Sequence, residues 1–105
     1  MSRQHMVVTT TTFTAASTTA TITASSAVLA GMQIGTDSSN DPTITVYDGT
    51  DNTGNEIVPT TTYDASALGL NGFIGAYDKR AYNGIFVEVS IGGGSVEVTI
   101  DYRNT

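Results

Sequence analysis

The residues of this sequence that could do chemistry are few, and none of them forms a catalytic set. The single histidine, His5, lies in the polar N-terminal segment, and the chain has no cysteine. A serine–histidine–aspartate triad needs its histidine beside the other two groups, and thiolate chemistry or a zinc–thiolate site needs cysteine. The sequence therefore predicts a protein that is not an enzyme and that carries no cofactor.

Carboxylates are the remaining candidates for catalysis. Glu88 and Glu97 point outward from two alternating runs that we expect to pair, and two carboxylates are the machinery of glycoside hydrolysis. The sequence supplies no apolar pocket that would raise the pKa of one of them. We therefore expect both side chains to face solvent and to keep a sheet soluble.

Two loops are rich in the oxygen ligands that calcium prefers, at residues 37–42 and 48–56. The second loop departs from the EF-hand pattern, because Thr53 occupies a position that the pattern reserves for aspartate or asparagine. Aspartate, asparagine and glycine are also the ordinary residues of turns. We expect both loops to be turns and predict no bound metal.

Charge is scarce in this chain. Charged residues make up 13% of it, against about 25% in typical soluble domains, and the formal net charge is −6. The four basic residues form no patch for phosphate backbones or anionic lipids. No run approaches the roughly 18 apolar residues of a membrane span, and the start lacks the apolar stretch of a signal peptide. We expect no nucleic-acid or membrane partner, and a protein made and used without Sec-type export.

Alternation of apolar and polar residues predicts an all-β domain. Residues 85–91 and 96–102 alternate on either side of Gly92-Gly93-Gly94, which predicts a β-hairpin. Five further runs predict shorter strands, at residues 18–24, 26–35, 43–47, 56–58 and 72–77, and residues 65–70 predict one helical turn capped by Asp64. Turn signals at intervals of about 8–12 residues are typical of a sandwich or barrel, here of six to eight short strands.

Threonine, alanine and serine replace charge over residues 9–23. Threonine favours extended structure, and its neutral hydroxyl costs less to bury than an ion. Because Val7, Val8 and Phe13 supply apolar anchors, we expect residues 1–19 to form an extended arm ordered by contact, ahead of a sandwich domain at residues 20–105. Lys79 and Arg80, in a mixed-charge loop, could dock on an acidic partner. The predicted partner-binding residues are Val7, Val8, Phe13, Lys79 and Arg80.

The order of these segments resembles a known family. The segments are Thr-Val-Tyr-Asp-Gly-Thr at 45–50, Asn-Gly-Ile-Phe-Val-Glu-Val at 83–89, Gly92-Gly93-Gly94, and Val-Glu-Val-Thr-Ile-Asp-Tyr at 96–102. They resemble small virion proteins of tailed bacteriophages, of the capsid decoration or cement type, over roughly residues 22–102. The resemblance implies a jelly-roll-like antiparallel β-sandwich on the capsid surface, commonly a homotrimer that clamps neighbouring major capsid protein subunits and reaches them with its N-terminal arm. It brings no catalytic residues.

Other interpretations remain open at this point. Similar sandwiches occur in head fibres and tails. The five tyrosines could stack on sugars, which would make the chain a carbohydrate-binding module, with or without calcium. Such a module is expected to have a shallow aromatic face near residues 48–56. A small glycosidase is a third interpretation. If the arm clamps a capsid, removing residues 1–14 is expected to weaken capsid binding and to leave the fold intact.

Overall fold

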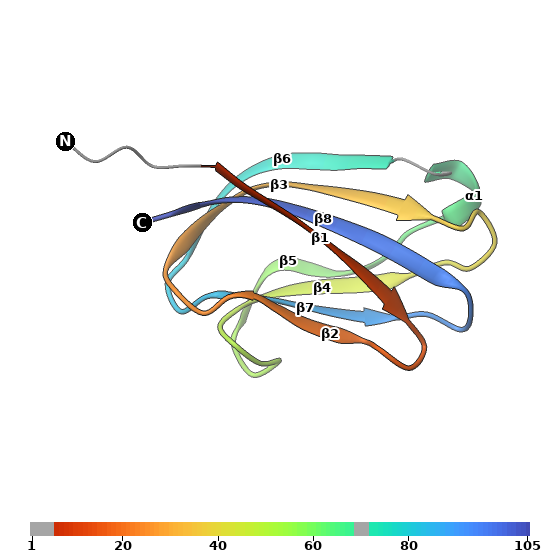
Figure 1. Ribbon diagram of the computed structural model, residues 1–105, viewed down its shortest axis with the longest axis horizontal. Helices are drawn as coiled ribbons and strands as arrows, with labels where there is room; N and C mark the ends of the chain where they lie inside the picture. The colour runs from red at the N-terminus through yellow and green to blue at the C-terminus, as the bar shows by residue number, and fades with distance from the viewer. Residues whose placement is uncertain (1–5, 69–71) are drawn as a thin grey trace.

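The computed structural model describes residues 6–68 and 72–105, and the side chains of residues 6–67 and 78–105. The described chain is almost entirely β, with eight strands and one helical turn (Figure 1). These elements are β1 (Met6–Thr14), β2 (Thr19–Thr23), β3 (Ala27–Thr36), β4 (Thr43–Asp48), β5 (Asn55–Thr62), α1 (Ala65–Leu68), β6 (Gly72–Ala81), β7 (Ile85–Ser90) and β8 (Ser95–Asn104). The predicted turn of helix is present, and Asp64 caps it by accepting the Ala67 amide hydrogen.

The strands form two four-stranded antiparallel sheets. Sheet A has the order β1-β8-β3-β6, and sheet B has the order β2-β7-β4-β5. The first strand pairs with the last, the second with the seventh, the third with the sixth and the fourth with the fifth, as in one long hairpin folded over on itself. This nested pairing across two packed sheets is a jelly roll. The expected all-β, jelly-roll-like sandwich is therefore confirmed.

The core lies between the two sheets and takes side chains from every strand, mostly at alternate positions. Ile44 and Val46 face inward from β4, as their spacing predicts. The fully buried larger side chains are Phe13, Leu29, Met32, Ile34, Ile44, Val46, Ile85, Val87, Val89, Val96, Val98 and Ile100. Branched aliphatic side chains dominate this set, which suits the pleated inner faces of a sandwich.

The predicted hairpin between residues 85–91 and 96–102 is wrong. Both segments are strands, but β7 pairs with β2 and β4 in sheet B, whereas β8 pairs with β1 and β3 in sheet A. The chain crosses from one sheet to the other at Gly92-Gly93-Gly94. Both strands alternate because each packs one face on the shared core, and that pattern is the same whether two strands are paired or lie opposite each other. Glu88 and Glu97 consequently lie on different sheets and form no carboxylate pair.

Two other strands differ from the sequence expectation. Regular alternation over residues 26–35 would place Val28, Ala30, Met32 and Ile34 on one face. The register of β3 shifts between Leu29 and Gly31, so that Leu29 joins Met32 and Ile34 in the core and Val28 and Ala30 are only partly buried. Strand β6 continues to Ala81 and includes the charged residues 78–80, which were expected in a loop. Alternation in the predicted strand at residues 72–77 would place Phe73 and Ile74 on opposite faces, and both side chains fall outside the described ones.

The N-terminal segment is an integral strand of the domain over residues 6–14, which corrects the expectation of an arm. β1 pairs with β8 in continuous register from Met6↔Arg103 to Thr14↔Ser95. Phe13 is fully buried in the core and Val7 packs against it. Because β1 supplies part of the core, removing residues 1–14 would damage the fold, and the expected intact truncation does not follow. The boundary at residue 19 divides no structural unit.

Asp37 ties the loop after β3 to the first residue of β8. Its carboxylate accepts hydrogen bonds from the Asn40 side-chain amide at 2.7 Å, from the backbone amides of Asn40 and Ser39 at 2.8 and 2.9 Å, and from the Ser95 amide at 3.4 Å. These bonds, that from the Asn40 side chain first, lower the pKa of Asp37 from 3.8 to about 2. The stabilising contribution of this carboxylate is therefore fully present above pH 3.8.

Acid titration tests this tie. As the pH falls from about 4 to 2, the folded protein is expected to lose stability, because Asp37 must take up a proton that its hydrogen bonds disfavour. Asp51 and Asp64, whose pKa values are also lowered by local hydrogen bonds, act in the same direction. Urea midpoints measured at pH 2, 3, 4 and 6 should fall below pH 4, and the fall should be smaller in Asp37→Asn. An equal fall in both proteins would contradict this role for Asp37.

Candidate functional site

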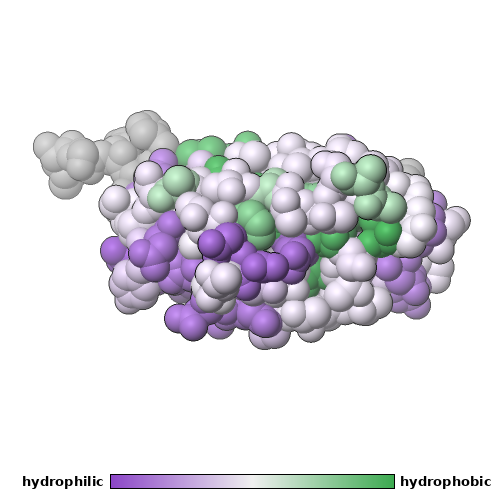
Figure 2. Space-filling view, turned by 90° about the horizontal axis from the view of Figure 1, so that it is seen from below, coloured by the Kyte–Doolittle hydropathy of each residue, from purple (hydrophilic) through white to green (hydrophobic). Residues whose placement is uncertain are grey.

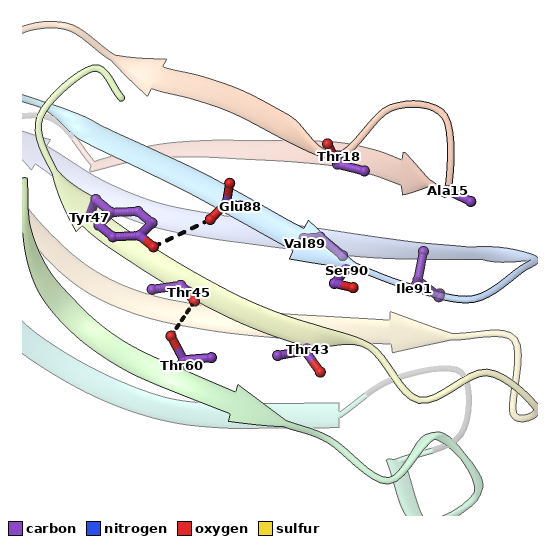
Figure 3. Close-up of a pocket in the computed structure, with 10 residues that line it drawn as sticks. All are labelled: Ala15, Thr18, Thr43, Thr45, Tyr47, Thr60, Glu88, Val89, Ser90 and Ile91. Atoms are coloured by element: carbon purple, nitrogen blue, oxygen red, sulfur yellow. Dashed lines mark hydrogen bonds between the residues drawn. The ribbon is translucent and has the colours of Figure 1, made fainter. Parts of the chain in front are cut away.

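A shallow groove crosses the outer face of sheet B. It has a volume of about 460 Å³ and follows β4 between its neighbours β7 and β5 (Figure 3). Its main lining residues are Thr43, Thr45, Tyr47, Thr60, Glu88 and Ser90, and Ala15, Thr18 and Ile91 line its other end. The side chains of β4 reach the groove because alternate residues of a strand share one face, and Ile44 and Val46 take the opposite, buried face.

Threonine hydroxyls pair across the strands that form the groove. Thr45 Oγ1 lies 2.7 Å from Thr60 Oγ1, and Thr43 Oγ1 lies 2.6 Å from Thr62 Oγ1. Both pairs join β4 to β5. This arrangement was not predicted from the sequence. Its signal is the spacing Thr-x-Thr at 43/45 and again at 60/62, which becomes informative once the two strands are paired.

Glu88 is the one carboxylate among the residues that line the groove. The Tyr47 hydroxyl donates to Glu88 Oε1 at 3.3 Å, and the Asn52 side chain donates to Oε2 at 3.3 Å (Figure 3 draws the first bond). Desolvation, and then the charge of Glu88, raises the pKa of Tyr47, which keeps the phenol protonated as a donor. The Tyr47 ring is held against Phe86, with ring centroids 6.2 Å apart at an angle of 51°.

The surface around the groove is polar with little charge. Figure 2 shows the molecule from the sheet B side, where pale residues of intermediate hydropathy cover much of the face and strongly hydrophilic residues gather mainly at its left. The basic residues with described side chains, Lys79, Arg80 and Arg103, all belong to β6 and β8 of sheet A. Sheet B therefore presents Glu88 without a cation of its own sheet beside it.

The strand register divides the five predicted partner-binding residues between two faces of sheet A. One row across the sheet faces outward and contains Met6, Arg103, Val28 and Arg80. The next row alternates to the core side and contains Val7, Tyr102, Leu29 and Lys79. Phe13 is buried, so it cannot contact a partner in the folded chain. Val8, whose side chain is 64% exposed, and Arg80 share the outer face. Lys79 lies on edge strand β6 and is exposed in spite of its row, so Val8, Lys79 and Arg80 all remain available.

The four edge strands of the two sheets differ in how they are protected against pairing with another chain. β5 carries Glu56, Pro59 and register shifts, β6 carries three charged residues and register shifts, and β2 is a five-residue strand with a register shift. β1 has nine residues, no charge, no proline and an unbroken register. Charges, prolines, bulges and short length are the usual devices that protect an edge, so β1 is the open edge of this sandwich.

The loop carboxylates proposed as alternative calcium ligands are engaged in turns. Asp51 accepts hydrogen bonds from the Thr53 amide and hydroxyl, and Asp48 accepts one from the Asn83 amide at 2.7 Å. The residues that the structure describes contain no group of three or more histidine, cysteine, aspartate or glutamate side chains that could hold a metal ion.

The tyrosines do not form one platform. Tyr102 is buried in the core, Tyr63 packs partly against it, and Tyr82 is 67% exposed with the Arg80 guanidinium 5.1 Å from its ring centroid. Tyr47 alone lies in the groove, and the side chain of Tyr77 is outside the described residues.

No protein-family model matches this sequence, and a search of curated proteins finds no match. Among the residues with a described position, no helix has the length and hydropathy to cross a bilayer.

Proposed function

We propose that this chain is a non-enzymatic structural protein of a tailed-phage virion, which associates with copies of itself, as a trimer, and decorates the capsid by bridging major capsid protein subunits. The jelly roll is compatible with this role and does not by itself select it, because one fold serves many functions. The proposal is supported by the resemblance of residues 22–102 and by the surface chemistry described above.

The observation that carries the proposal is the open edge of β1. A strand edge presents unpaired backbone donors and acceptors, to which another chain can add a strand. Met6 and Val8 are 50% and 64% exposed beside this edge, so a neighbour would also cover apolar surface. The low charge of β1 reduces the cost of removing it from water. The open strand edge, the exposed apolar side chains and the absence of charge on β1 together favour a contact with another protein.

Two lysines placed on β1 test the proposal. Val8 stands opposite Asp101 and Thr12 stands opposite Glu97, both across to β8. In Val8→Lys/Thr12→Lys each lysine therefore gains a carboxylate partner within the sheet, worth about 0.2–1 kcal/mol per pair, while the edge becomes charged. We expect light scattering to show an oligomer for the native chain and a monomer of undiminished thermal stability for the double variant.

The matched control is Gln33→Lys, which adds a positive charge to the outer face of β3, inside the sheet and away from the edge. It should keep the native mass. In co-sedimentation with expanded phage heads, the native chain and Gln33→Lys should bind, and the double variant should bind at least about tenfold more weakly. A native chain that is monomeric at all concentrations, or a double variant that binds heads normally, would count against the proposal.

A further inference from the structure

We infer that the groove on the outer face of sheet B is a binding site for a neutral oligosaccharide. This is a second function, separate from assembly through β1, and it stands on different residues. The groove volume of about 460 Å³ lies within the range of about 300–1,000 Å³ that small-molecule sites occupy.

The paired threonines match the chemistry of a polyol. When two hydroxyls bond to each other, only one of their two hydrogens is used, so each pair retains a hydrogen to donate and lone pairs to accept. The Thr43–Thr62 pair therefore offers both a donor and an acceptor to a ligand, and each hydroxyl is already oriented by its partner. In the Thr45–Thr60 pair the Thr45 hydroxyl also bonds to the Tyr47 hydroxyl, so this pair offers its oxygen lone pairs as acceptors. A sugar, which carries several hydroxyls that each donate and accept, is the complementary ligand.

Glu88 adds a strong acceptor to this surface. An ionised carboxylate has about four acceptor sites, and the bonds from Tyr47 and Asn52 occupy one site on each oxygen, at 3.3 Å each. The remaining capacity suits two neighbouring hydroxyls of one sugar ring. Hydrogen bonds to a charged acceptor are roughly twice as strong as neutral ones, so Glu88 is the group whose loss should weaken binding most.

The charge distribution selects a neutral ligand. The formal net charge of the chain is −6, and the one ion pair in the described part of the chain, Arg103 with Asp78 at 3.0 Å, lies on sheet A. A uronic acid or a sulfated sugar would place its anion near an uncompensated Glu88 and would be repelled. The half-buried Tyr47 ring and the threonine methyl groups supply apolar surface for the carbon–hydrogen face of a sugar ring.

An NMR titration of the full chain tests this inference. The probes are cellohexaose, xylohexaose and mannohexaose, with hexagalacturonic acid as the anionic comparison. We expect at least one neutral probe to shift the amide signals of Thr43, Thr45, Glu88 and Ser90 with a Kd of about 1 mM or lower, and we expect hexagalacturonic acid to leave them unchanged.

Matched variants connect the binding to the groove. Glu88→Gln should weaken the bound probe about tenfold, and Thr45→Val, which removes one hydroxyl at constant shape, should also weaken it. Glu97→Gln, which removes a charge from the outer face of sheet A, should bind within about twofold of the native chain. Val8→Lys/Thr12→Lys should also bind normally, so a failure of the assembly proposal would leave this one standing.

Three results would overturn the inference. They are the absence of shifts with all three neutral probes, equal or tighter binding of hexagalacturonic acid, and unchanged binding by Glu88→Gln.

Discussion

Replacing Phe13 by alanine is expected to lower the free energy of unfolding by about 3–5 kcal/mol, the usual cost of emptying a buried phenylalanine site. Phe13 is fully buried, and it stands opposite Val96 where β1 meets β8. Natural domains are stable by about 5–15 kcal/mol in total. The substitution should therefore lower the thermal midpoint steeply, although the residue lies in a segment whose sequence looks like a polar tail.

Urea unfolding followed by far-ultraviolet circular dichroism measures this effect. Val8→Ala is the control on the same strand: its side chain is 64% exposed, so the change should stay within about 0.5 kcal/mol. If Phe13→Ala were as stable as Val8→Ala, β1 would not belong to the core, and the interpretation of residues 1–19 as an arm would return.

Replacing Gly84 by alanine is also expected to be strongly destabilising. Gly84 has a φ of +126°, and a Cβ there would lie 2.5 Å from the Thr23 carbonyl oxygen and 2.9 Å from the Gly49 carbonyl oxygen. A non-glycine residue in such a backbone region costs about 1–3 kcal/mol, and relieving the overlap costs about 1–3 kcal/mol more. Because both neighbours are backbone atoms, no side-chain rotation removes the clash.

The control for this change is Gly92→Ala, because a Cβ at Gly92 would have open space within 4 Å. Its free energy of unfolding should stay within about 0.5 kcal/mol of the native value. The contact at stake in Gly84→Ala joins two turns, since the Gly49 amide donates to the Gly84 carbonyl at 3.0 Å. Loss of amide protection from hydrogen exchange at Gly49 in Gly84→Ala would show that the turns have separated, and equal stability of the two variants would refute the strain argument.

The strands could be predicted from the sequence because alternation survives any choice of partner. Ile44 and Val46 had to face a core whatever lay beside them, and the same holds for the branched residues of β7 and β8. Which sheet a strand joins is a long-range choice that alternation does not encode, and the hairpin prediction failed for that reason. The β3 register shift could not be predicted for a related reason, since the small residues at positions 30 and 31 fit either face.

The candidate sites were harder to predict because they depend on register. Lys79 and Arg80 look like one basic pair in the sequence, but neighbours on a strand point to opposite faces. The threonine-rich sequence of β1 did not indicate that this strand packs on the core, because only Val7 and Phe13 are apolar residues on its inner side. The groove on sheet B requires the pairing of β4 with β5 before Thr43, Thr45 and Thr60 can be seen as neighbours.

The nested strand order also governs how this chain reaches its fold. Strand β1 has no place in sheet A until β8, the last strand in the sequence, is present; Thr10 and Thr99, which bond across the two strands, are 89 residues apart. Such distant pairings fold slowly, typically in milliseconds to seconds. During that interval the β8 of a second copy offers β1 the same register as its own. Exchange of β1 between copies is therefore the misassembly that this topology favours, and the conditions of synthesis will decide how often it occurs.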